Sequence, residues 1–315
     1  MLRYRLIFGP LMIGLAVGLF YLDSCVDHVR LAGMWQDLFG RAYPPAGLVL
    51  LGVCMVLIPL AARELSAIFG ANDIRLPTWL IALASMAACL AIYATPQSSA
   101  APTGAVVVAS VLVACFVITL VWHSRHARAQ GAMAAAGAVM FAVAYLGLMM
   151  GFYLAIRRWH SPWTVLGVIL IVKMGDIGAY AVGRAIGRHK LIPWLSPGKT
   201  WEGLAGAIIF CVLVAMAFAW LSQHYPDLTT AYRTSAEGLV AEAQQFHIGV
   251  AALAGLLLAL VGHAGDLTMS LFKRDAGLKD SGRSVPGFGG LLDVLDSPLL
   301  AAPVAYWMLA LAAKA

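Results

Sequence analysis

Long apolar runs dominate the chain, and short polar segments separate them. A bilayer core of about 30 Å needs about 20 predominantly apolar residues in a helix, and nine stretches approach or meet that length. They are residues 6–22, 45–62, 77–94, 103–122, 131–155, 162–183, 203–221, 247–265 and 297–312. The pattern therefore predicts an all-α polytopic membrane protein with about nine transmembrane helices.

The composition supports the same class. Of 315 residues, 62% are hydrophobic and 11% are charged, and the mean hydropathy is +0.85. Soluble domains carry about 25% charged residues, so this chain is far outside their range. The net charge of +6 is spread over short basic clusters beside apolar runs, which is typical of topology signals and not of a nucleic-acid surface. The five cysteines have no CxxC spacing, so we predict neither a disulfide nor a zinc framework.

The charges of the connecting segments predict the orientation. Basic residues gather before the first apolar run and in alternate loops after it: Arg3, Arg5, Arg63, Arg75, Arg125, Arg128, Arg184, Arg188, Lys190 and Lys199. The other loops are neutral or carry most of the acidic residues outside the last segment: Asp23, Asp27, Asp37, Asp227, Glu237 and Glu242. Arg157 and Arg158 are the exception. Since cytoplasmic loops carry the excess of Lys and Arg, we expect a cytoplasmic N-terminus and cytoplasmic polar loops in the C-terminal half.

The most polar segment is residues 263–298. Between Gly265 and Asp296 it holds nine of the chain's 36 charged residues, which comprise 21 basic and 15 acidic ones. If the preceding helix continues, Asp266, Ser270 and Lys273 share one of its faces, because they are spaced i, i+4 and i+7. Asp293 and Asp296, at i and i+3, share a face of the next helix. Two such faces, joined by a glycine-rich basic loop, predict a site for a divalent cation and phosphate.

A second polar segment lies inside the sixth apolar run. Lys173, Asp176 and Tyr180 project from one helix face near its predicted cytoplasmic end. Ionisable groups inside a span are costly and by default indicate function, although a structural ion pair between helices is the alternative.

The segment that follows, SPGKTWEG, starts a new apolar run. Ser196 or Thr200 is expected to cap that helix, whose N-terminus favours an anion, and Lys199 adds a full positive charge there. A cap alone does not require Lys199 and Glu202. The GKT string is not a Walker A motif, because the earlier glycine and the preceding strand are missing.

The first half of the chain offers little chemistry. We predict that residues 1–160 form a scaffold of transmembrane helices and that residues 161–315 form the catalytic region. Glu64, beside Arg63 at the end of the second apolar run, is interpreted as a solvated helix end.

The polar motifs together resemble the signature of phosphatidate cytidylyltransferases, also called CDP-diacylglycerol synthases. The resemblance covers residues 162–312. It includes the strings D-x-x-A-Y and S-P-x-K-T-x-E-G, which lie between Asp176 and Gly203. Two later positions depart from the usual pattern of the family: Phe288 stands in place of His, and Val294 stands in place of Arg. The remaining matching positions are Ser270, Lys273, Arg274, Lys279, Asp280, Ser281, Gly282, Pro286, Gly287, Gly289, Gly290, Leu292, Asp293, Asp296 and Ser297.

The resemblance implies transfer of a cytidylyl group from CTP to phosphatidic acid, a step of phospholipid biosynthesis. It places Mg²⁺, with a monovalent cation such as K⁺ as a further candidate, on Asp266 and Asp293. Asp280 and Asp296 are candidates for further ligands or orienting groups, and Asp176 closes the site. The expected phosphate-binding groups are Lys199, Lys273, Arg274, Lys279 and Arg283. The resemblance also implies a homodimer and a bacterial inner membrane.

Three alternative functions compete with this one. A cytidylyltransferase acting on another lipid phosphate, such as an ether lipid, fits the same headgroup chemistry. A CDP-alcohol phosphatidyltransferase would need the string D-G-x-x-A-R, which does not occur. Inverted repeats and charges at the bilayer midplane would favour a transporter that uses Lys173 and Asp176 as an ion relay. The charges instead gather toward one membrane face.

Overall fold

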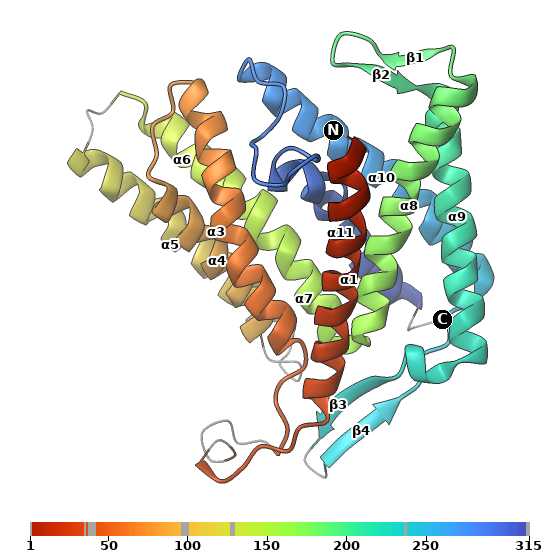
Figure 1. Cartoon of the computed structure of the whole chain (residues 1–315). Coiled ribbons are helices and arrows are strands. Elements are labelled where there is room, and N and C mark those ends of the chain that lie inside the picture. The colour runs from red at the N-terminus through yellow and green to blue at the C-terminus, as the bar shows by residue number, and fades with distance from the viewer. Residues whose placement is uncertain are drawn as a thin grey trace.

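The computed structural model describes residues 2–34, 36, 42–95, 101–126, 130–235 and 238–312. Within these ranges the chain is a bundle of helices that run between two ends of the molecule (Figure 1). Three charged residues used to predict the orientation lie outside the described residues: Asp37, Arg128 and Glu237.

The helices follow the predicted apolar runs. Their bounds are α1 Leu2–Asp27, α3 Leu48–Ala71, α4 Thr78–Ala94, α5 Ala101–His126, α6 Ala132–Ala142, η1 Val143–Leu148, α7 Met149–Trp159, α8 Pro162–Ile186, α9 Trp201–His224, α10 Ile248–Asp275 and α11 Leu291–Ala312. Because α6, the π-helical turn η1 and α7 follow one another without a break, they form one span. In the described part of the chain, eight helices are long and apolar enough to cross a bilayer, and α4, at the predicted third span, has 17 residues. The prediction of a polytopic helical protein is confirmed.

Two small antiparallel hairpins were not predicted. Strand β1 (Lys190–Ile192) pairs with β2 (Ser196–Thr200), and β3 (Ala231–Ser235) pairs with β4 (Gly238–Glu242), after the short 3-10 helix η2 (Pro226–Leu228). In Figure 1 the N-terminus, the β1–β2 hairpin and the α10–α11 connection lie at one end of the bundle, and β3–β4 lies at the other. The segments predicted to share a face therefore share an end. That this end is cytoplasmic stays a prediction.

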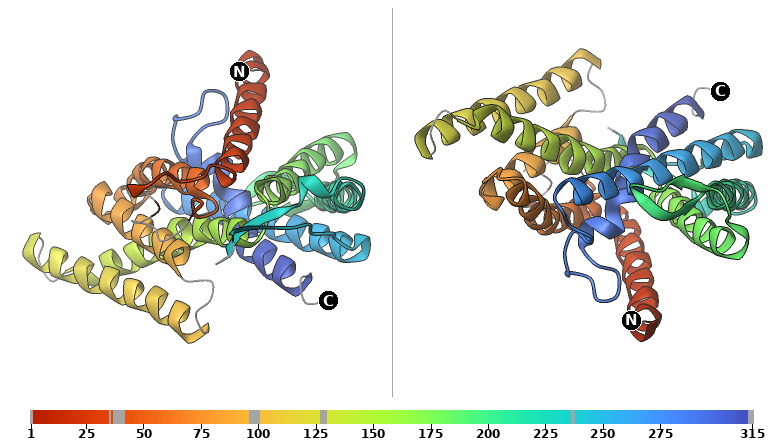
Figure 2. Two further views of the ribbon diagram at one scale, coloured as in Figure 1. Left: turned by 90° about the horizontal axis from the view of Figure 1, so that it is seen from below. Right: turned by 90° about the horizontal axis from the view of Figure 1, so that it is seen from above.

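The buried apolar residues form two clusters. One is built on α3, α4 and the α6–η1–α7 span, with Leu65, Ile81 and Leu146 at its centre. The other lies among α8, α9, α10 and α11. Viewed along the helices, α5 and α6 mark one edge of the bundle and α9 the opposite edge (Figure 2).

A buried ion triad explains why Arg157 breaks the charge pattern of the loops. Arg157 is 1% exposed, and its Nε donates to Asp23 Oδ2 at 2.5 Å while its Nη2 donates to Asp27. The other Asp23 oxygen accepts from the backbone N–H of Val49 at the start of α3. Arg157 thus ties α7 to α1 and α3 at the end of the bundle that carries β3–β4, and it is not a free loop charge.

Candidate active site

The site is centred on the place where α10 and α11 cross. Helix α10 continues beyond the predicted span to Asp275, so Asp266 lies on a regular helix. At Gly265 the two backbones approach so closely that an added Cβ would lie 2.5 Å from the carbonyl oxygen of Asp296. Only glycine permits this approach without a shift of the helices, and it brings the segments that carry Asp266 and Asp296 together.

Helix α8 joins this crossing. The Ser297 hydroxyl lies 3.3 Å from Asp176 Oδ1 and 3.2 Å from Asp296 Oδ1, so it can donate its one hydrogen to either carboxylate. Asp176 Oδ2 accepts from Lys173 Nζ at 3.0 Å. Lys173 and Asp176 thus share one face of α8, as predicted, and through Ser297 their ion pair belongs to the same network as Asp296. Asp296 is 4% exposed, so it is the most enclosed of these acids.

The β1–β2 hairpin delivers Lys199 to the same place. Of the two predicted capping residues, Thr200 is the one that caps α9, because its hydroxyl accepts from the backbone N–H of Gly203 at 3.1 Å. Ser196 lies at the other end of strand β2. The preceding Lys199 reaches back to α10, where its Nζ lies 3.0 Å from Asp266 Oδ2. The other Asp266 oxygen lies 3.4 Å from the Ser270 hydroxyl. The two sequence motifs thus meet at one carboxylate.

Asp293 is held by the loop between α10 and α11. Its Oδ1 accepts from Lys273 Nζ at 2.6 Å. Its Oδ2 lies 3.0 Å from the backbone nitrogen of Ser281, 3.1 Å from the Ser281 hydroxyl and 2.9 Å from the backbone nitrogen of Gly290. Both N–H groups belong to the loop, so the glycine-rich segment folds back around this carboxylate at the first turn of α11.

Glu64 is the residue that the sequence analysis assigned wrongly. It is 6% exposed and lies inside α3, which continues to Ala71, so it is not a solvated helix end. Its carboxylate accepts from the Ser281 hydroxyl at 2.8 Å and the Ser284 hydroxyl at 2.6 Å.

Glu64 also caps helix α11. The first two backbone N–H groups of α11, those of Leu291 and Leu292, donate to its two carboxylate oxygens at 2.8 and 2.9 Å. A carboxylate is favourable at this position because the helix N-terminus leaves N–H groups without intrahelical partners. Glu64 therefore fixes the start of α11 and the loop that surrounds Asp293.

Several predicted site residues are directed elsewhere. Tyr180 is exposed, and its hydroxyl accepts from Arg184 at 2.6 Å, one turn along α8. Glu202 accepts from the His189 ring at 2.6 Å and thereby closes the β1–β2 hairpin onto α9. The remaining basic and acidic residues of the loop have exposed side chains: Arg274, Lys279, Asp280 and Arg283.

The donor set fits a hard divalent cation that is shared with a ligand. In the described ranges no three His, Cys, Asp or Glu side chains come together as a complete metal cage. Asp266 and Asp293 lie on adjoining helices, and each is balanced by a lysine, Lys199 and Lys273 respectively. Mg²⁺ is usually held by one or two carboxylates plus substrate phosphates and water, so two carboxylates are sufficient.

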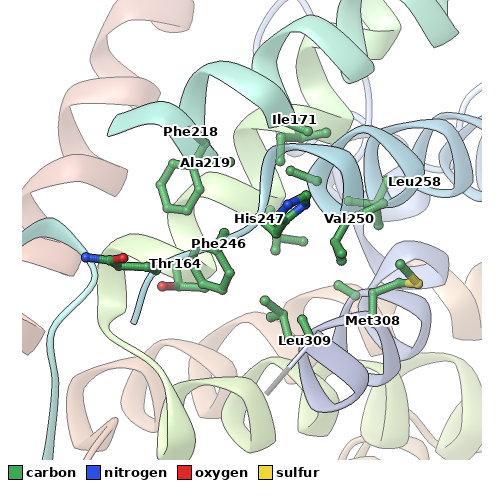
Figure 3. Close-up of a pocket in the computed structure, with 17 residues that line it drawn as sticks. Thr164, Ile171, Phe218, Ala219, Phe246, His247, Val250, Leu258, Met308 and Leu309 are labelled. Atoms are coloured by element: carbon green, nitrogen blue, oxygen red, sulfur yellow. The ribbon is translucent and has the colours of Figure 1, made fainter. Parts of the chain in front are cut away.

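A separate cavity of about 300 Å³ lies among α8, α9, α10 and α11. Thr164 at the start of α8, His247 at the start of α10 and Met308 near the end of α11 line it (Figure 3). Its walls are almost entirely apolar and include none of the carboxylates described above. It lies toward the β3–β4 end and is not part of the polar site.

The close helix crossing gives a first prediction. Gly265→Ala is expected to lower the free energy of unfolding by about 1–3 kcal/mol, because the new methyl group must displace the backbone of α11. Gly52→Ala on α3 is the matched control. Its Cβ would meet nothing within 4 Å, so it is expected to be neutral or slightly stabilising. Thermal unfolding of both variants in detergent measures the difference, and equal melting temperatures would contradict the close approach at Gly265.

Known proteins are similar to this chain over most of its length. The model of the "Cytidylyltransferase family" matches residues 39–312. A phosphatidate cytidylyltransferase of Staphylococcus epidermidis is 31% identical over 262 residues, which are 82% of this chain and 88% of that protein.

Two other relatives match over a shorter stretch. A phosphatidate cytidylyltransferase of Haemophilus influenzae is 38% identical over 145 residues, 46% of this chain and 45% of that protein. The uncharacterized protein YnbB of Escherichia coli is 37% identical over 145 residues, 46% of this chain and 42% of that protein. The chain thus aligns with less than half of the length of these two proteins.

Proposed function

The chain belongs to the cytidylyltransferase family, and from this membership we propose that it transfers the cytidylyl group of CTP to phosphatidic acid, giving CDP-diacylglycerol and pyrophosphate. The resemblance seen in the sequence motifs is confirmed at the level of the family. Two relatives named phosphatidate cytidylyltransferase, one of which is aligned over most of its length, support the choice of substrate.

The observation that carries the proposal is the meeting of four acidic and three basic side chains from four elements. Asp176, Asp266, Asp293 and Asp296 come from α8, α10 and α11, and they are linked to Lys173, Lys199 and Lys273 by direct ion pairs or through Ser297. Fixed charges of both signs at one site suit a reaction that joins two polyanions, because positioning and charge neutralisation are its main requirements.

The proposed step is an in-line displacement at the α-phosphorus of CTP. An oxygen of the lipid phosphate forms the new bond to this phosphorus, and the bond to the oxygen that bridges to the β-phosphate breaks, so pyrophosphate leaves. A phosphate monoester is largely ionised near neutral pH, with a second pKa of about 6, so the attacking oxygen needs no strong general base. Within the described part of the chain, no hydrogen-bonded His–Asp pair belongs to this network, in agreement with that requirement.

Each charged group has a proposed task. Asp266 and Asp293 would hold Mg²⁺, which supplies charge neutralisation for the nucleotide phosphates when it is bound. Lys199 and Lys273 lie against these two carboxylates and are placed to bind phosphate oxygens. Lys173 and Asp176 close the site from α8, and the exposed Arg274, Lys279 and Arg283 of the loop attract the incoming anions.

The position of the site suits substrates from two phases. It lies near the helix ends beside the β1–β2 hairpin and the α10–α11 loop, where water-soluble CTP and a membrane lipid can both reach it (Figure 1). We propose that this end faces the cytoplasm of a bacterial cell, where CTP is made. A homodimer, expected from the family resemblance, is part of the same proposal.

A transfer assay tests the function directly. Purified protein in detergent is given CTP labelled at the α-phosphate, phosphatidic acid and Mg²⁺, and label is counted in the organic phase. The expected result is labelled CDP-diacylglycerol that disappears when EDTA is added. An ether-lipid phosphate in a parallel reaction tests the alternative acceptor, and no organic-phase label with either lipid would refute the proposal.

A further inference from the structure

One buried tyrosine hydroxyl near the site has nothing to bond to. Tyr145 is 2% exposed, and within the described part of the chain its Oη has no hydrogen-bond partner. A buried hydroxyl is unfavourable without a hydrogen bond, and almost all buried polar groups have one. Tyr153, on the same continuous span, shows the usual arrangement, because its Oη donates to the carbonyl oxygen of Pro298 at 2.8 Å.

The backbone around Tyr145 is unusual as well. It lies in η1, the π-helical turn between α6 and α7, and such turns are rare and frequently occur at functional sites. Its ring stacks on Phe141 with centroids 5.4 Å apart, and Phe141 meets the edge of Phe272 of α10 at 4.7 Å. Phe141 therefore links the tyrosine ring to the helix that carries Asp266.

The hydroxyl lies within electrostatic range of the acidic network. Tyr145 shares its apolar cluster with Met269, Leu292 and Leu299, each of which lies one to three residues from one of the site carboxylates. The carboxylates of Asp296, Asp266 and Asp293 all act electrostatically on this hydroxyl. The tyrosine therefore lies close to the site carboxylates, on a span that was predicted to be scaffold.

A ligand bound at the site would supply the hydrogen-bond acceptor that this hydroxyl lacks. Asp266 and Asp293 already pair with Lys199 and Lys273, and one Asp296 oxygen accepts from Ser297. A phenol hydroxyl is a good donor, and a phosphate brings several acceptor oxygens. A phosphate is therefore a suitable acceptor for this hydroxyl.

We propose that Tyr145 is a substrate-binding residue whose hydroxyl donates a hydrogen bond to a phosphate oxygen of the bound nucleotide or lipid phosphate. This inference rests on the proposed function. It adds a donor from η1 to a site whose charged groups come from α8, α10, α11 and the β1–β2 hairpin.

The test compares two substitutions that each remove one oxygen atom. Tyr145→Phe is expected to lower kcat/KM about tenfold, since a hydrogen bond to a charged group is lost. Its melting temperature without substrate should stay equal to that of the wild type or rise, because an unpartnered hydroxyl is removed. Tyr153→Phe, the matched control, is expected to melt at a lower temperature and to keep its KM values.

Separate titrations identify which phosphate is bound. A higher KM for CTP, with a smaller CTP-induced rise in melting temperature, assigns the hydrogen bond to the nucleotide. A higher KM for phosphatidic acid, with an unchanged response to CTP, assigns it to the lipid.

Two results would overturn the inference and leave the proposed function intact. One is a Tyr145→Phe protein with kcat/KM within twofold of wild type for both substrates. The other is a loss of thermal stability equal to that of Tyr153→Phe, which would make the hydroxyl structural.

If the wild type transfers no cytidylyl group, the proposed function fails. The inference is then decided by the thermal shifts that CTP and phosphatidic acid induce, and equal shifts in wild type and Tyr145→Phe would refute it.

Discussion

Asp266→Ala and Asp293→Ala are each expected to lower cytidylyl transfer about 10³-fold. Each change removes a carboxylate proposed to hold the divalent cation, and a loss of about 4 kcal/mol of transition-state stabilisation corresponds to this factor. Each also leaves a lysine, Lys199 or Lys273, without its counter-ion. Initial rates with labelled CTP at saturating phosphatidic acid measure the effect.

Asp227→Ala is the control for this experiment. Asp227 is exposed in η2, close to the β3–β4 hairpin, and its removal changes the net charge by the same amount. It is expected to keep the wild-type rate. Near-normal turnover by both site variants would show that the metal assignment is wrong, whatever reaction the protein catalyses.

Glu64→Gln is expected to lower the free energy of unfolding by on the order of 3 kcal/mol and to reduce transfer as well. Four donors point at the carboxylate: the hydroxyls of Ser281 and Ser284 and the N–H groups of Leu291 and Leu292. The amide keeps one acceptor oxygen but places an NH₂ group, itself a donor, among them. Buried donors left without an acceptor cost about 1–3 kcal/mol each. Thermal unfolding and the transfer rate are measured on the same preparation.

Asp73→Asn provides the comparison for Glu64→Gln. Asp73 is exposed just beyond the end of α3 and has a left-handed backbone with φ of 59°, which asparagine also tolerates. This variant should melt and turn over like the wild type. If Glu64→Gln did the same, the carboxylate would not hold the start of α11 in place.

The sequence predicted the parts of the fold that depend on local pattern. The apolar runs are long and nearly uncharged, so their length identifies the spans without any knowledge of contacts. The spacing of Lys173 and Asp176 likewise predicted that they share a helix face, and the structure pairs them there. The hydroxyl of Tyr180, predicted on the same face, accepts from Arg184 one turn further along, and its role in binding substrate stays a prediction.

The sequence could not predict contacts between distant segments. Glu64 lies 217 residues before Ser281 and looked like an ordinary polar helix end, and only the packing of α3 against the α10–α11 loop reveals its role. Tyr145 was equally inconspicuous, because neither the π-helical turn nor the missing hydrogen-bond partner leaves a mark in the residue pattern. Arg157 looked like an exception to the charge rule until its partners Asp23 and Asp27 were seen.

Two boundaries were also set too early. The predicted second and eighth spans ended at residues 62 and 265, just before a charged residue, Arg63 or Asp266. The helices themselves continue, α3 to Ala71 and α10 to Asp275. Beyond the apolar core a helix can continue with charged residues, since its backbone hydrogen bonds do not depend on the side chains. In α10 this extension carries Asp266, Ser270 and Lys273.

The central claim is that Asp266 and Asp293, from two different helices, hold the same cation together with the nucleotide phosphates. Binding of Mn²⁺ in the presence of CTP, followed by electron paramagnetic resonance, tests it most directly in the wild type, in Asp266→Asn, in Asp293→Asn and in the double variant. We predict that either single substitution abolishes CTP-dependent Mn²⁺ binding and that the double variant is no worse than the singles. Unchanged Mn²⁺ binding in both single variants would contradict the account.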